Sequence, residues 1–304
     1  MRKRQGNSRF RLLDGLIREF VPSPFYRHND RMRILLLLLL FTATLEFGLR
    51  ATGTAGANET PSGPARLFNG RNLEGWFTYL EGKGRNNDPE KVFQVHDGVI
   101  HIYKDAEEGT KMPFGYVATE NEYADYHLRL EYRWGTKRFV PRAQDKRDSG
   151  LLYHVVGPDT VWPCSVELQI QEGDAGDIFT VNTRVTSTLD PKRLVPDEPK
   201  QWAGSAFLEP ADGGVERSQG GDWISRIVKS GTYEMDGWNT IEAIVEGDRA
   251  THLVNGKINN RCWNILQPDP QAPGKFIPLK AGRIMLQAEG AEVFYRNIEI
   301  RPLK

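Results

Sequence analysis

The chain has 304 residues, and its 40 basic side chains balance its 40 acidic ones. The balance is uneven, because residues 1–57 hold ten Lys or Arg and four Asp or Glu, which leaves 30 basic and 36 acidic side chains in residues 58–304. A mildly acidic body has no electrostatic footprint for DNA or RNA, so we expect no nucleic-acid partner.

Residues 1–57 form a basic extension that ends in the pattern of a secretory signal peptide. Two arginines precede an apolar run at 34–45, and the small-residue cleavage pattern of Ala55, Gly56 and Ala57 follows. The run is shorter than the roughly 20 apolar residues that a membrane-spanning helix needs. We therefore expect an extracytoplasmic protein, periplasmic or secreted, that contacts the membrane only if the signal segment is retained.

Residues 58–65 have the composition of a linker, and residues 66–304 read as a single domain of short strands. Apolar and polar residues alternate in many segments, as in YHLRLEYRW at 126–134, and Gly, Asp, Asn and Pro separate these segments. Long segments with helical spacing are absent from this part of the sequence. The pattern is typical of an antiparallel sandwich, so we expect an all-β fold.

Two features of the domain allow more than one interpretation. Residues 189–221 are rich in Pro, Gly and charge, and read as a long ordered loop anchored by Trp202 and Phe207, either functional or a tolerated insertion. Cys164 and Cys262 could pair in an oxidising compartment or remain two buried thiols. The sequence contains no CxxC, HExxH or Cys/His cluster with zinc spacing.

The segment CSVELQIQ at 164–171 has the alternation of a strand with one apolar and one polar face. We expect the apolar side chains, those of Val166, Leu168 and Ile170, to lie between the two sheets. The polar face carries one carboxylate among hydroxyl and amide groups, from Ser165, Glu167, Gln169 and Gln171.

The domain contains, in order, the segments RLFNGRNLEGW, YADYHLRLEYRW, RDSGLLYHV, SVELQIQEGDAGD, WNTIEAIVEGDRATHLVNG and GRIMLQAEGAEVFYRNIEIRPL. Taken in this order, they resemble the 3-keto-disaccharide hydrolase family, some members of which are described as 3-keto-glucoside 1,2-lyases or 3-keto-2-hydroxy-glucal hydratases. The resemblance implies a concanavalin A-like jelly roll with a concave sheet that lines a sugar groove, and an oxidised (3-keto) di- or oligosaccharide or glycoside as the substrate. Many relatives carry a histidine where this chain has Glu289, so imidazole chemistry is not carried over to that position.

The implied chemistry assigns roles to polar residues of these segments. The C3 carbonyl of a 3-keto sugar acidifies the hydrogen on C2, so a base can remove it, the oxygen on C1 can leave, and water can add back. We expect Glu167 to be the base and Glu289 to share the acid–base work. His154 is expected to donate to the leaving oxygen or to ligate a metal, and Arg129 to hold the enolate oxygen. The expected substrate-binding residues are Gln169, Gln287, Arg129, Glu131, Asp148 and Trp162.

The same residues also have purely structural interpretations. Glu167 could lie on a solvated strand face or pair with Arg129, and Arg129 could instead pair with Glu131 across the polar face. Asp148 precedes a strand and could serve only as a turn residue. A lone histidine such as His154 is often structural.

Other functions are compatible with such a fold. A non-catalytic carbohydrate-binding module would bind glycans without turnover, and solvent-facing Glu167 and Glu289 would favour it. A retaining endoglucanase of the laminarinase type needs two glutamates close in space, whereas Glu167 and Glu172 have opposite parity on a strand. The sequence requires no cofactor; a divalent metal is possible, and the loop carboxylates of Asp174 and Asp177 could hold calcium.

Overall fold

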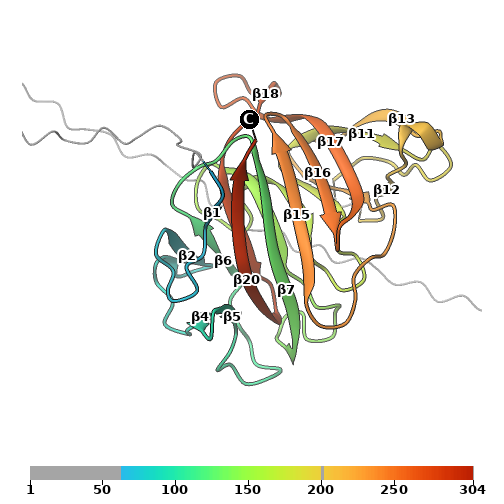
Figure 1. Cartoon of the computed structure of the whole chain (residues 1–304). Coiled ribbons are helices and arrows are strands. Elements are labelled where there is room, and N and C mark those ends of the chain that lie inside the picture. Colours follow the sequence, from blue (N-terminus) through green and yellow to red (C-terminus); the bar gives the residue numbers. More distant parts are fainter. Residues whose placement is uncertain (1–62, 200–201, 304) are drawn as a thin grey trace, which may run out of the picture. The chain divides into compact units, whose positions relative to one another are not determined.

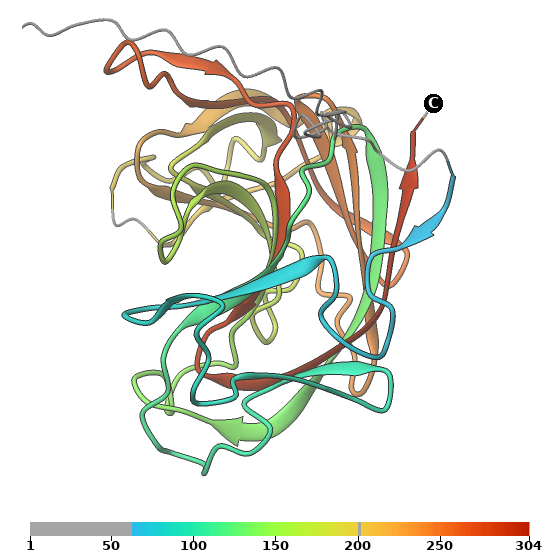
Figure 2. The ribbon, with the colours of Figure 1, turned by 90° about the vertical axis from the view of Figure 1, so that its left-hand side faces the viewer.

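Figure 1 shows the computed structural model of the protein, which describes residues 63–199 and 202–303. The predicted signal peptide, its cleavage site and most of the predicted linker lie outside the described residues. Two β-sheets pack face to face in the described part, as Figure 2 shows from the side. The all-β sandwich of the concanavalin A-like jelly-roll type expected from the sequence is confirmed.

One sheet has eleven strands, and its broad face is turned toward the viewer in Figure 1. Nine strands form a continuous path, and two short strands pair with members of that path. Its order is β13 (Val215–Gly220), β11 (Arg184–Leu189), β17 (Lys257–Pro268), β16 (Arg249–Val254), β15 (Asn239–Glu246), β7 (Tyr126–Arg138), β20 (Ala291–Pro302), β5 (Val99–Ile102) and β4 (Phe93–His96), with β1 (Ala65–Arg66) on β20 and β18 (Phe276–Pro278) on β17.

The other sheet has nine strands and carries the site described below. Its pairs are antiparallel except for the contact between its first two strands, which is parallel. Its order is β12 (Ser205–Ala206), β14 (Ile224–Val228), β10 (Ile178–Val181), β9 (Cys164–Gln169), β8 (Gly150–Val156), β19 (Arg283–Ala288), β6 (Gly115–Thr119), β2 (Trp76–Leu80) and β3 (Gly84–Arg85).

The hydrophobic core lies between the two sheets, where the alternation of β9 predicted it. Val166 and Leu168 of β9, and Ile170 just after it, have no exposed surface, and they share one cluster with Leu128 and Leu130 of β7. The opposite face of β9 is polar, yet it is also almost completely covered. Because a buried polar face is costly unless its groups find partners, this face marks the region where function is to be sought.

The segment at 189–221, predicted as a long ordered loop, contains short regular elements in its described part. It contains β12, a 3-10 turn at Pro210–Asp212 and β13. Asp197 ties it to the nine-stranded sheet by accepting a hydrogen bond from Ser225 Oγ of β14 (2.6 Å), and it accepts another from the backbone N–H of Gly220 in β13 (2.8 Å). Only one of the two predicted anchors is buried: Phe207 is 4% exposed, whereas Trp202 is 55% exposed.

Two smaller points concern the described residues alone. Cys164 and Cys262 are both free thiols, so the alternative of unpaired cysteines holds. Across residues 63–199 and 202–303, no helix has the length and apolar character needed to cross a membrane.

Candidate functional site

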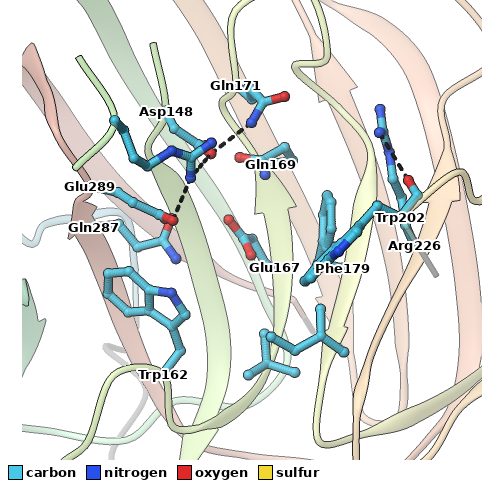
Figure 3. Close-up of a pocket in the computed structure, with 13 residues that line it drawn as sticks. Asp148, Trp162, Glu167, Gln169, Gln171, Phe179, Trp202, Arg226, Gln287 and Glu289 are labelled. Atoms are coloured by element: carbon cyan, nitrogen blue, oxygen red, sulfur yellow. Dashed lines mark hydrogen bonds and ion pairs between the residues drawn. The ribbon is translucent and has the colours of Figure 1, made fainter. Parts of the chain in front are cut away.

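A hollow of about 320 Å³ opens on the face of the nine-stranded sheet that is turned away from the core. The polar face of β9 forms its floor, β10 and β14 form one side, and the end of β19 forms the other (Figure 3). The lining residues are Arg142, Asp148, Trp162, Glu167, Gln169, Gln171, Phe179, Val181, Trp202, Ile224, Arg226, Gln287 and Glu289.

Glu167 is the carboxyl at the centre of the floor, and one of its two oxygens lacks a hydrogen-bond donor. Its side chain is buried, and Oε1 has no partner among the described residues. Burial raises the pKa of this carboxyl well above its ordinary value, and the negative charges of Glu289 and Asp148 raise it further. Glu167 therefore holds a proton at a pH at which an ordinary glutamate has lost it, and is a strong base once ionised.

Glycine at position 150 makes room for this carboxyl. Gly150 lies on β8 beside β9, and a Cβ at this position would overlap Oε1 of both Glu167 and Gln287. The two oxygens therefore converge over the Cα of Gly150. Gln287 Oε1 is also buried without a hydrogen-bond partner, so two unsatisfied acceptors face the same small space. Unsatisfied buried acceptors are rare in folded proteins and mark places where a ligand or water completes the hydrogen bonding.

Arg142 links the two other carboxyls of the hollow. Its Nη1 lies 2.6 Å from Glu289 Oε1 and 2.5 Å from Asp148 Oδ2. Burial and the charge of Asp148 raise the pKa of Glu289 to about 8, although the guanidinium of Arg142 opposes the shift. Burial also raises the pKa of Asp148, against Arg142 and a 2.7 Å hydrogen bond from Gln171 Nε2. Arg142 thus serves two carboxyls at once, and Glu289 retains a proton near neutral pH.

The remaining walls are largely apolar. One side is formed by β10, β14 and the end of the loop that leads into β12, and it is lined by Phe179, Val181, Ile224 and Trp202. Trp162 stands on the opposite side, below Gln287 in Figure 3, and stacks on Phe114 with ring centroids 6.4 Å apart. Acid–base groups beside the ring of Trp162 suit a sugar ring, whose faces are apolar and whose edge carries hydroxyls.

Six of the nine predicted site residues line the hollow together: Glu167, Glu289, Gln169, Gln287, Asp148 and Trp162. Their convergence shows that the polar faces of β9 and β19 belong to one surface. Asp148 is a buried partner of Arg142 and not merely a turn residue.

Arg129 and Glu131 do not belong to this site. Both lie on β7, in the other sheet, on the face turned away from the core. They contact each other at 3.4 Å, and Arg296 approaches Glu131 at 2.8 Å, which is the structural pairing considered as the alternative. Alternation placed both residues on a polar face correctly, but it could not say to which of the two sheets that face belongs.

His154 is also outside the hollow, because a bulge interrupts β8 at this point. Its φ is 53°, and the register with β9 shifts between Tyr153 and Val156. The imidazole is buried, its Nε2 lies 2.8 Å from the carbonyl oxygen of Gly247, and burial lowers its pKa to about 4. Val155 occupies the outer face instead, in a small cluster with Leu152. The predicted proton donor and metal ligand therefore cannot reach this site.

The sequence interpretation missed Arg142, which lies in the connection between β7 and β8 and follows no periodic pattern. It also missed the apolar wall of Phe179 and Trp202. Gln171 carried a usable signal, since it shares the parity of Glu167 and Gln169 in the predicted strand.

The carboxylates considered for other chemistry have different partners. Glu172 lies outside the hollow and pairs with Arg147 at 2.8 Å, so it does not form the two-glutamate site of a laminarinase with Glu167. Asp177 pairs with Arg226 at 2.5 Å, and Asp174 with Lys146 at 2.8 Å. Within the part of the chain that the structure describes, no group of three or more His, Cys, Asp or Glu side chains is arranged to hold a metal.

Fold and hollow together define a class: a β-sandwich protein with a buried carboxylate–arginine cluster in a hollow on the outside of one sheet. Residues 63–301 match the family of 3-keto-alpha-glucoside-1,2-lyase-like domains. The chain therefore belongs to that family, as its resemblance implied. Membership gives it a carbohydrate-related function with a sugar as ligand.

The chain is also similar to several solved structures, at low identity. A protein from Parabacteroides distasonis, provisionally described as a glycosyl hydrolase, is 18% identical over 80% of this chain and 94% of its own, with a TM-score of 0.44. The carbohydrate-binding module CBM66 from Bacillus subtilis is 8% identical over 75% and 95%, with a TM-score of 0.40. A β-glucanase from Bacillus licheniformis is 11% identical over 81% and 100%, with a TM-score of 0.40. No curated protein matches the chain.

Proposed function

We propose that this protein is an enzyme that cleaves 3-keto-glycosides by elimination and hydration. The observation that carries the proposal is the state of Glu167, a buried carboxyl with a raised pKa and an unpartnered oxygen, beside an arginine held by two further carboxyls. A surface used for binding alone has no need of such groups, which reduce stability, whereas proton transfer from carbon requires a strong and desolvated base.

In the proposed reaction, ionised Glu167 takes the hydrogen from C2, and the electron pair of the C–H bond moves into an enolate whose charge rests on the C3 oxygen. The enolate then restores the C3 carbonyl, forms the C1–C2 double bond and breaks the bond between C1 and the leaving oxygen, which takes up a proton. Addition of water across C1 and C2 completes a net hydrolysis. The substrate carbonyl is the electron sink, so the reaction needs no cofactor to store electrons.

Other groups of the hollow supply the remaining functions. Glu289, whose pKa lies at about 8, holds a proton at neutral pH and is the proposed donor to the leaving oxygen. Arg142, not Arg129, is the cation available to the developing enolate oxygen, because it is the one that reaches Glu289 and Asp148 in the hollow. Gln169 and Gln287 are proposed to hold sugar hydroxyls, and Trp162 to cover one face of the ring.

The alternative is a carbohydrate-binding module without turnover. Solvent-facing glutamates would favour this alternative. Glu167 does not face solvent, because it is only 5% exposed. The burial of the carboxyls therefore supports the enzyme.

We also propose that the protein is exported and that its mature chain begins near Asn58. The support is the apolar run at 34–45 and the small residues that follow it. N-terminal sequencing of the native protein tests this proposal. An intact chain starting at Met1 or Met32 would contradict it.

Wild-type protein incubated with 3-keto-glucosides in deuterated water tests the enzymatic proposal. We expect 3-keto-glucose and the free aglycone as products, deuterium at C2 of the sugar, and no change in the unoxidised glucosides that serve as matched controls. Turnover should persist after dialysis against a chelator; loss of turnover that added divalent ions restore would assign the protein a metal. Glycan binding with neither turnover nor C2 exchange would favour the binding module.

A further inference from the structure

We propose that the apolar wall of the hollow, formed by Phe179, Val181, Trp202 and Ile224, is a subsite for the aglycone, and that it selects an apolar, planar leaving group over a second sugar. This inference rests on the proposed function, because it assigns the leaving group of that reaction to one end of the same hollow. Trp202 and Phe179 are its specificity-determining residues.

The hollow has two chemically different ends. Gln287 and Glu289 lie at one end in Figure 3, with Trp162 below them, Glu167 lies in the centre, and Phe179, Trp202 and Arg226 lie toward the other end. Since Glu167 must reach the C2 hydrogen and Gln287 and Trp162 are the proposed contacts of the sugar, the oxidised ring lies over Glu167 and the polar end. The substituent on C1 then extends toward the other end, across the side chains of β10 and β14.

Arg226 is the charged residue at that end, and most of its N–H groups are already used. Its Nε donates to Asp177 Oδ2 at 2.7 Å, its Nη2 lies 2.5 Å from the same oxygen and 3.4 Å from Asp174 Oδ2, and its Nη1 donates to the carbonyl of Trp202 at 3.3 Å. The guanidinium is therefore neutralised by carboxylates beneath it and serves to hold the wall. It offers little to the hydroxyls of an incoming ligand.

Trp202 is held in place but left open to solvent. Its carbonyl accepts a hydrogen bond from Arg226, and its ring centroid lies 6.4 Å from that of Phe179, with 40° between the two planes. The residue is 55% exposed. An exposed indole on the rim of a hollow, packed on a second aromatic ring, favours a ligand that covers it, because apolar surface is then removed from water.

The composition of the wall decides between an aromatic group and a second sugar. A pyranose that leaves water must find partners for its hydroxyls, because each buried and unpaired hydroxyl costs free energy. The side chains of Phe179, Val181 and Ile224 have no polar atoms, Trp202 has only the N–H of its indole, and most N–H groups of Arg226 are occupied. A planar apolar aglycone needs no such partners, so it fits this wall better than a glucosyl group does.

Benzyl, methyl and glucosyl 3-keto-glucosides test the inference, in both anomers. Benzyl and methyl alcohols differ little as leaving groups, so a difference between these two substrates reports contacts and not intrinsic reactivity. We expect kcat/KM to be at least about tenfold higher for the benzyl substrate, in line with the roughly 10–200-fold worth of one buried methylene. The glucosyl substrate should not exceed the methyl one.

Trp202→Ala and Phe179→Ala should bring the benzyl and methyl values close together, chiefly by raising KM for the benzyl substrate. Trp238→Ala, on the other sheet between Arg133 and Arg296, is the matched control and should leave the preference intact. Equal kcat/KM for all three substrates, or a preference for the glucosyl one, would overturn the aglycone subsite while leaving the proposed reaction standing.

Binding of the unoxidised benzyl and methyl glucosides, measured by calorimetry, separates the two proposals. If no 3-keto-glycoside is turned over, the proposed reaction fails, yet tighter binding of the benzyl compound that Trp202→Ala abolishes would still support the apolar subsite. Equal binding of both compounds, or a benzyl preference that survives Trp202→Ala, would contradict it.

Discussion

Glu167 can occupy the floor of the hollow only because residue 150 on the neighbouring strand is glycine. A Cβ at position 150 would overlap Glu167 Oε1. Gly150→Ala should therefore displace the carboxyl and reduce kcat at least about tenfold, since a misplacement of about 1 Å can cost on the order of a hundredfold. Gly63→Ala, where nothing lies within 4 Å of the added carbon, is the control. Unchanged kinetics in Gly150→Ala would show that the observed position of Glu167 is not the active one.

The raised pKa of Glu167 makes a prediction about stability. A carboxyl whose folded pKa exceeds its unfolded value contributes stability that is complete below the unfolded pKa and is lost as pH rises through the folded pKa. Glu167→Gln removes this loss, so its Tm should exceed that of the wild type at pH 8, and the difference should shrink toward zero near pH 4.

Thermal unfolding across this pH range measures the effect. Glu108→Gln, at an exposed glutamate, controls for the removal of a charge. The same difference in Tm at pH 4 and pH 8 would mean that the folded protein does not raise the pKa of Glu167.

Arg142 is predicted to be needed for turnover, whereas Arg129 is not. Arg142→Met leaves Asp148 and Glu289 without their shared donor and removes the cation proposed to meet the enolate, so kcat should fall by about 10²–10³-fold. Arg129→Met, on the far face of the other sheet, should change kcat by no more than about twofold. Circular dichroism confirms that each variant is folded. Equal losses in the two variants would return the role to Arg129.

A substitution at Leu168 tests which face of β9 packs against the core. The residue has no exposed surface, so Leu168→Ala should lower the free energy of unfolding by roughly 2–5 kcal/mol. Leu194, 42% exposed, provides the matched control, and Leu194→Ala should cost less than about 0.5 kcal/mol. Denaturant unfolding measures both, and similar losses would place the core elsewhere.

Alternation was sufficient to predict the sandwich and the two faces of β9 and β19, because strand periodicity is a local property of the sequence. It could not predict which polar faces share a surface. Glu131 and Glu167 occupy equivalent positions in their own strands but lie on opposite sides of the molecule, since that depends on the order of strands in two sheets. Alternation could not predict a local irregularity either. The bulge at His154 turns its imidazole toward Gly247.

Residues in connections were hardest to find. Arg142 follows β7, and Trp202 precedes β12, so neither lies in a periodic segment. Their place in the hollow depends on tertiary contacts with Glu289 and Arg226 that no short stretch of sequence encodes.

Glu167→Gln tests the central claim most directly, because it keeps the shape of the side chain and removes the basic oxygen. Turnover of a 3-keto-glucoside and exchange of its C2 hydrogen with deuterated water should be measured on the same samples. A positioned base contributes about 10²–10⁴-fold, so the account predicts that both rates fall together by at least about a hundredfold while substrate binding is retained. Near-normal turnover or undiminished C2 exchange in Glu167→Gln would contradict it.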